Sequence, residues 1–188
     1  MKQKGLIIGG AVIIVLIILV AIFAGNYNGM VSKQADVQNA FANVDTQLQR
    51  RADLIPNLLE TVKGYMAHEQ EIMTAVAEAR SKLAGAVTVE DKQAADSELS
   101  GALSRLLMVA ENYPDLKADS QFTALTDELA GTENRIAVAR RDYNETVTAY
   151  NKSIRTFPSN LFAAMFGFGE EPLFEADEGA EQALKVVF

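Results

Sequence analysis

Side chains that commonly perform catalysis or bind metal ions are scarce in this chain. It contains one histidine, His68, and no cysteine, which excludes disulfides, thiolate catalysis and zinc–sulfur sites. His68 is followed by Glu69 and Glu71, but adjacent helical residues point to different faces, so we expect a solvated histidine rather than a metal ligand. Nucleophile-elbow, phosphate-loop and H-E-x-x-H motifs are also missing from the sequence. We therefore predict no catalytic residue, no metal and no cofactor, in a protein that is not an enzyme.

A second set of polar residues borders the apolar faces of the predicted helices. Tyr143-Asn144 and Tyr150-Asn151 are seven residues apart, which places both pairs on one helical face. Polar groups beside an apolar seam fix the register between helices, because each requires a matched partner. A polar groove that recognises a partner helix is the alternative interpretation. The residues predicted to act at the seam are Asp45, Arg51, Glu133, Asn144 and Asn151.

Helices are the elements that would position these residues, since apolar side chains recur about every 3.6 positions. The pattern predicts four helices, at about residues 27–53, 56–84, 88–112 and 119–157. A tight turn or a sharp kink is expected at Pro56, between the first two helices, because proline disfavours helix at the residue before it and suits the first turn of a new helix. Four amphipathic helices with short links predict an all-α, antiparallel four-helix bundle over residues 26–158.

Residues 6–24 form an unbroken apolar run, LIIGGAVIIVLIILVAIFA, of 19 residues. As a helix the run spans about 30 Å, the thickness of the hydrocarbon core of a bilayer. A cleaved signal peptide is the alternative, but its apolar core has only about 7–15 residues, and Ile22 is too bulky for the position three before a cut. We therefore predict a transmembrane anchor over residues 1–25. The residues expected to face lipid are Leu6, Ile7, Ile8, Gly9, Gly10, Val12, Ile13, Ile14, Leu16, Ile17, Ile18, Leu19, Ile22 and Phe23.

Positive charges predict the orientation of this anchor. Lys2 and Lys4 precede the apolar run, whereas Lys33 alone follows closely behind it. Because positive flanks favour the cytoplasmic side, we expect a single-pass protein with a cytoplasmic N-terminus and an extracytoplasmic bundle.

The C-terminal tail, residues 159–188, is apolar at first and then acidic. An antiparallel bundle returns the chain to the bilayer after Phe157, so the next apolar residues are expected to contact lipid, a neighbouring subunit or the end of their own bundle. These contact residues are Leu161, Phe162, Met165, Phe166 and Phe168. The chain ends in Val186, Val187 and Phe188, a form that adds as a strand to peptide-binding domains.

The formal net charge of −8 makes nucleic acid an unsuitable partner. No basic stripe is present that would neutralise phosphates. The anchor makes the lipid bilayer the expected partner instead.

Several long motifs resemble the LemA family. They are VDTQLQRRADLIPNLLETVKGYMAHE (44–69), YPDLKA (113–118), GTENRIAVARRDYNETVTAYNKSIRTFPSNLFAAMFGF (131–168) and the PLFEA…KVVF ending. The resemblance covers nearly the whole chain and implies a bacterial inner-membrane protein with one N-terminal transmembrane helix and an up-and-down or bromodomain-like bundle. It carries over no catalytic residue. A relative in magnetosome-forming bacteria is implicated in building the magnetosome membrane, and family genes often lie near those of membrane proteases or TPM-domain proteins.

Two functions are therefore expected. The first is a self-associating, membrane-anchored scaffold that organises or shapes the membrane, with the Gly9-Gly10 pair permitting close approach of anchor helices in a homo-oligomer. The alternative is an adaptor that docks a membrane protease, a TPM-domain protein or another membrane protein through residues 186–188.

Overall fold

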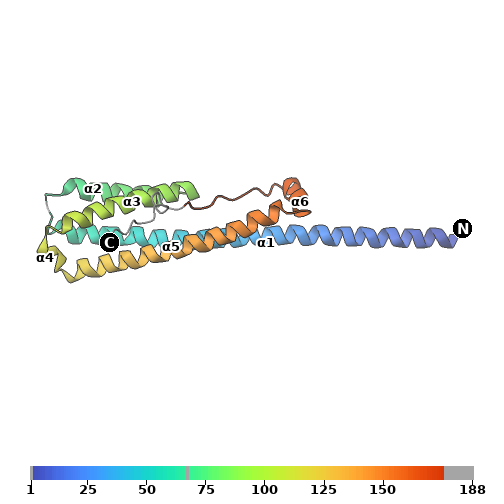
Figure 1. Ribbon diagram of the computed structural model, residues 1–188, viewed down its shortest axis with the longest axis horizontal. Coiled ribbons are helices and arrows are strands. Elements are labelled where there is room, and N and C mark those ends of the chain that lie inside the picture. The colour runs from blue at the N-terminus through green and yellow to red at the C-terminus, as the bar shows by residue number, and fades with distance from the viewer. Residues whose placement is uncertain (1, 67, 176–188) are drawn as a thin grey trace, which may run out of the picture. The chain divides into compact units, whose positions relative to one another are not determined.

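The computed structural model describes residues 2–66 and 68–175, and all regular secondary structure in this part of the chain is helical (Figure 1). The helices are α1 (Lys2–Lys63), α2 (Gln70–Gly85), α3 (Val89–Ala110), α4 (Pro114–Lys117), α5 (Ser120–Arg155) and α6 (Ser159–Phe166). The all-α class is confirmed. The antiparallel four-helix arrangement stays a prediction.

The chain divides into two compact units. Of the residues that the structure describes, the first, here the N-terminal unit, contains 2–40 and 145–171. The second, here the core unit, contains 41–66, 68–144 and 172–175. Helices α1 and α5 each contribute one stretch to both units, so the boundary does not follow the ends of helices.

Apolar residues that recur every three or four positions form the interior of the core unit. They include Val44, Leu48, Ile55, Leu58 and Val62 of α1, Val76 and Leu83 of α2, Leu99, Leu103 and Leu106 of α3, and Ile136 and Tyr143 of α5. Removing one large apolar side chain from water contributes about 1.5–3 kcal/mol. The spacing read from the sequence is therefore the spacing of the packed faces.

The break predicted at Pro56 is wrong, because α1 continues through this residue to Lys63. Proline has no N–H, so the carbonyl of Ala52, four residues earlier, lacks its helical donor. The Nε of Arg80 in α2 donates to this carbonyl at 2.9 Å and replaces the missing hydrogen bond. The turn after α1 begins at residues 64 and 65 instead.

Two polar caps define helix starts in the core unit. Thr88 precedes α3, and its hydroxyl oxygen accepts a hydrogen bond from the N–H of Asp91 at 3.1 Å, as the T-x-x-D pattern predicts. Asp119 precedes α5, and its Oδ1 accepts from the N–H groups of Gln121 at 2.8 Å and Phe122 at 3.0 Å. Both caps satisfy amide groups that the first helical turn leaves without partners.

Asp119 also ties the turn after α1 to α5, because the Tyr65 hydroxyl donates to its Oδ2 at 2.9 Å. The hydrogen bond from the Phe122 N–H, followed by the one from Tyr65, holds the pKa of Asp119 below its ordinary value of 3.8. The hydrogen bond to Asp119 likewise raises the pKa of Tyr65 above its ordinary value of 10.0.

Replacing Arg80 by methionine should expose the cost of the proline in α1. The variant Arg80→Met leaves the buried carbonyl of Ala52 without a donor, so we expect a loss of about 1–3 kcal/mol in the free energy of unfolding. The matched background is Pro56→Ala, which restores the N–H and should make Arg80→Met much less costly. Urea unfolding in mild detergent, followed by far-UV circular dichroism, measures the cycle. Equal costs of Arg80→Met in both backgrounds would contradict this explanation.

The pKa of Asp119 predicts a pH dependence. A carboxyl whose pKa is lowered on folding stabilises the protein at pH values above its ordinary pKa. This contribution disappears as the pH falls through the lower pKa of the folded state. Asp119→Asn keeps a capping side chain without the titration. We therefore expect the wild type to melt above Asp119→Asn at pH 6, and the gap in Tm to close below pH 3.8. A gap in Tm that does not change with pH would count against the role of the charge.

Candidate functional site

A cluster of buried charges joins α1, α3 and α5 in the core unit. Asp96 is 2% exposed, and its two carboxylate oxygens accept from Arg51 at 2.8 Å and Arg140 at 2.7 Å. Arg51 also donates to the Ser100 hydroxyl at 3.0 Å and pairs with Glu133 at 2.7 Å. The carboxylate on α3 thus binds one guanidinium group from α1 and one from α5, which links the three helices.

The structure thus brings Arg51 and Glu133 together, but it adds two residues that the sequence analysis missed. Asp96 precedes the buried Leu99 and Leu103 at helical spacing, so its place on an inward stripe was visible in the sequence. Its second partner, Arg140, lies at helical spacing between the buried Ile136 and Tyr143, but it is 44 residues away, and nothing in the sequence pairs the two.

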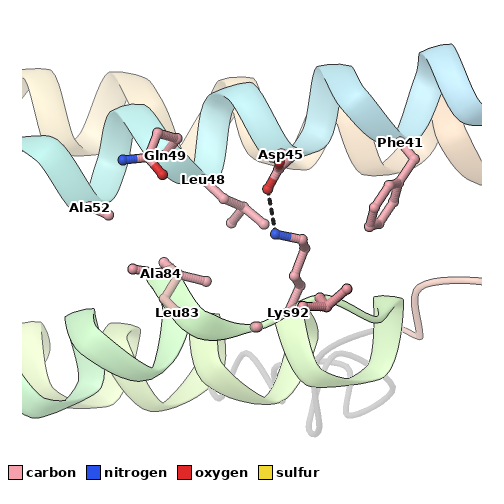
Figure 2. A pocket seen from close by; sticks show the side chains of 10 residues that line it. Phe41, Asp45, Leu48, Gln49, Ala52, Leu83, Ala84 and Lys92 are labelled. Atoms are coloured by element: carbon pink, nitrogen blue, oxygen red, sulfur yellow. Dashed lines mark hydrogen bonds and ion pairs between the residues drawn. The ribbon is translucent and has the colours of Figure 1, made fainter.

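A cavity of about 330 Å³ lies beside the seam residue Asp45 (Figure 2). Lys92 extends from α3 toward α1 and forms an ion pair with Asp45, and its ammonium lies 5.9 Å from the centre of the Phe41 ring. Leu48 and Leu83 contribute apolar wall. The charge of Lys92 is matched by that of Asp45, so the ion pair links α3 to α1 at the wall of this cavity.

The remaining seam residues, Asn144 and Asn151, contact extended chain rather than another helix. This segment is residues 169–175, here called the strap. In the N-terminal unit, Asn151 Nδ2 donates to the Glu171 carbonyl at 2.8 Å, and the Glu171 N–H donates to Asn151 Oδ1 at 2.9 Å. In the core unit, Asn144 forms the same pair with Phe174, at 2.8 and 2.9 Å. Each side-chain amide therefore replaces one residue of a neighbouring β-strand.

The hydroxyl group of each of the two tyrosines adds one hydrogen bond to the strap. The Tyr150 hydroxyl donates to the Gly169 carbonyl at 3.0 Å, and the Tyr143 hydroxyl donates to the Pro172 carbonyl at 3.0 Å. Burial, followed by the charge of Glu171, raises the pKa of Tyr150 above its ordinary value of 10.0, so its hydroxyl stays a donor at neutral pH. All of these hydrogen bonds are made with backbone groups of the strap.

Sequence spacing explains why a repeated Tyr-Asn pair suits an extended segment. Seven residues of helix rise about 10.5 Å, and three residues of extended chain advance about 10 Å. Asn144 and Asn151 are seven apart, and their partners Phe174 and Glu171 are three apart. The repeat was visible in the sequence, but its partner was not.

A second group of contacts packs α6 on α1 within the N-terminal unit. Phe23 contacts the rings of Phe162 and Phe166, each at 5.3 Å between centroids, and Tyr27 contacts Phe166 at 5.0 Å and Phe168 at 5.9 Å. These are edge-to-face arrangements, the favoured geometry for aromatic pairs.

The other face of α6 is open. Leu161 and Met165 are each 61% exposed, and Phe157, just before α6, is 76% exposed. The contacts expected for this segment were lipid, a neighbouring subunit or its own bundle. In the structure, Phe162, Phe166 and Phe168 contact residues of the same chain. The structure leaves Leu161 and Met165 uncovered.

The anchor residues are helical and exposed wherever their side chains are described. Between Ile13 and Phe23 the large apolar side chains are 38–66% exposed. This helix is long and apolar enough to cross a membrane. The side chains of Leu6, Ile7, Ile8, Gly9 and Val12, and all of Val186, Val187 and Phe188, lie outside the described residues.

Comparisons with known proteins place this geometry in context. A model of the LemA family matches residues 40–188, which contain both Tyr-Asn pairs, α6 and the strap. Protein LemA of Metamycoplasma hominis is 29% identical over 162 residues, covering 84% of this chain and 72% of that protein. Magnetosome protein MamQ 2 of Paramagnetospirillum magneticum is 26% identical over 186 residues, covering 85% and 68%. Magnetosome protein MamQ of Magnetospirillum gryphiswaldense is 25% identical over 168 residues, covering 76% and 62%.

Substituting Asn151 should release the strap without unfolding α5. In Asn151→Leu both hydrogen bonds to Glu171 are lost, so we expect amide hydrogen exchange at Glu171 to become about tenfold faster. Asn134→Leu is the matched control, since Asn134 is an exposed residue of the same helix with no bond to the strap. Mass spectrometry of peptides from residues 168–175 reports the exchange. Unchanged protection in Asn151→Leu would show that the strap is held by other contacts.

Proposed function

Because this chain belongs to the LemA family, we propose that it is a membrane-anchored helical scaffold that associates with copies of itself and organises or shapes a bacterial inner membrane. The family, the helical fold and the single long apolar helix identify a membrane-associated helical protein. Self-association, the antiparallel bundle and the orientation are the parts that we propose.

The observation that carries the proposal is the position of α6. Its aromatic residues pack on Phe23 and Tyr27, which flank the end of the apolar run at Ala24. Aromatic side chains are enriched at the boundary between lipid and water. The exposed Leu161 and Met165 would then lie in this interface, since short amphipathic helices bury their apolar face at that depth.

The return of the chain to the anchor supports the same conclusion. The Ser159 hydroxyl donates to Asn26 Oδ1 at 2.9 Å, although the two residues are 133 positions apart. An antiparallel bundle over residues 26–158 would have this consequence, because an even number of helices brings both of its ends to one side. Lys2 and Lys4 favour a cytoplasmic N-terminus and an extracytoplasmic bundle.

Close approach of anchor helices is the proposed means of association. At Gly10, an added Cβ would meet no atom within 4 Å, so this position on α1 leaves room for a neighbouring helix. Small residues allow membrane helices to pack closely. The relatives named magnetosome proteins are consistent with a role at a membrane.

Removing the open apolar face of α6 tests the scaffold. We expect the wild type to form cross-linked oligomers in vesicles, and Leu161→Ser combined with Met165→Ser to reduce the oligomer yield at least threefold. Burial of each of these two apolar side chains contributes about 1.5–3 kcal/mol. With serine at both positions, α6 would no longer gain this energy where it meets lipid and a neighbouring copy. Cross-linking followed by sizing in mild detergent measures the yield.

The matched control is Leu107→Ser combined with Met108→Ser, because these residues of α3 are also exposed, at 39% and 71%. This variant should cross-link as the wild type does. A wild type that yields monomers alone would remove the scaffold and leave the adaptor for a membrane protease or TPM-domain protein. Equal losses in both double variants would show that α6 has no special role.

A further inference from the structure

The N-terminal unit contains a cavity of about 400 Å³ next to the end of the apolar run. Its wall is formed by one face of α1, from Ile22 to Lys33, together with Ser153 of α5 and Ser159 of α6. The self-association proposed above does not involve this cavity. In a membrane-anchored protein, the cavity would lie at the level of the lipid headgroups.

Two glycines create the space. Gly25 and Gly29 are one helical turn apart and both line the cavity. A Cβ added at either position would meet no atom within 4 Å, so the room exists because these residues have no side chain. A larger residue would fill the cavity without disturbing the helix, since glycine is a poor helix former.

The polar part of the wall is held in place by hydrogen bonds. Asn26 accepts from Ser159 at 2.9 Å and donates to the Ile22 carbonyl at 2.9 Å. This leaves one N–H of the Asn26 amide for a ligand. Ser159 is also the first residue of α6, and the N–H groups of the next two residues already donate to the carbonyls of Thr156 and Pro158.

Lys33 supplies the charge. No carboxylate lines the cavity, and Lys33 has no ion pair with any residue that the structure describes. Lys33 lines the same cavity as Gly29, and side chains on a helix generally lean toward its N-terminus, which for α1 is the direction of the apolar run. A cation and an amide N–H on the wall of one cavity together favour an anion.

The depth of the cavity matches a lipid headgroup. The headgroup region occupies about 5–8 Å on each side of the hydrocarbon core. Gly25 to Gly29 lie about 1.5–7.5 Å beyond Ala24, the last residue of the apolar run. Ile22 and the exposed residues before it would contact the acyl chains.

We propose that this cavity binds the phosphodiester headgroup of one anionic phospholipid. Lys33 pairs with the phosphate, Asn26 donates to it, and the acyl chains lie along α1. The inference rests on membrane anchoring and not on self-association. It can therefore fail while the scaffold stands, and the reverse also holds.

Native mass spectrometry of the full-length protein in mild detergent tests the site. We expect the wild type to retain one phosphatidylglycerol at least fivefold more often than phosphatidylcholine, because one lysine near the headgroups favours an anionic lipid by about this factor. Lys33→Gln should abolish the preference. Gly29→Leu should reduce retention at least as much, because it fills the cavity while the charge remains.

Two matched controls keep the result specific. Lys152→Gln removes an exposed charge of α5 that does not line the cavity, and Gly101→Leu fills open space on α3. Both should retain phosphatidylglycerol as the wild type does. Far-UV circular dichroism confirms that every variant keeps its helix content.

The remaining outcomes would overturn the proposal. A loss in Lys33→Gln without a loss in Gly29→Leu would indicate diffuse attraction to an anionic surface rather than a site. Equal retention of phosphatidylcholine would remove the preference for anionic lipid. Inorganic phosphate that displaces phosphatidylglycerol at millimolar concentration would identify a free phosphate site instead.

Discussion

One helix, α1, must suit two different surroundings, and the rest of the structure depends on how it does so. A helix satisfies its own backbone groups, so it can cross a boundary between lipid and water without changing conformation. What changes is the pattern of its side chains. From Ile13 to Phe23 they are apolar and exposed, whereas from Met30 onward one side becomes buried at helical spacing, at Val37, Val44 and Leu48. The apolar stretch and the part of the core unit that begins at Phe41 thus belong to the same helix.

The strap shows how a helical protein can hold extended chain without a β-sheet. A strand edge offers an N–H and a C=O to its neighbour, and a side-chain amide offers the same two groups. Asn144 and Asn151 use both groups on one strap residue each. Because these hydrogen bonds involve the backbone of the strap, its side chains can make other contacts. The Phe174 ring, for example, packs against the Tyr143 ring, with 5.2 Å between their centroids.

The buried charges around Asp96 make a different contribution. A buried ion pair adds little stability over apolar residues of similar volume, but removing one partner costs about 3–5 kcal/mol. Arg51 and Arg140 come from different helices, so only one relative position of α1, α3 and α5 satisfies the carboxylate. We therefore expect the cluster to act on specificity rather than on stability. The seam hypothesis stays a prediction, and the cluster uses partly different residues from those it named.

Local chemistry in the sequence was enough to predict the all-α class, the long apolar N-terminal stretch, the Thr88 cap and most of the buried apolar positions. These features depend on residues within a few positions of one another, where spacing and composition carry the information. The continuation of α1 through Pro56 and the partners of Asn144 and Asn151 were decided by tertiary structure. The Arg80 donor is 28 positions from its acceptor, and the strap residues are 20 and 30 positions from their asparagines. Proline and asparagine each leave hydrogen-bonding capacity open, and only the folded chain determines which distant group satisfies it.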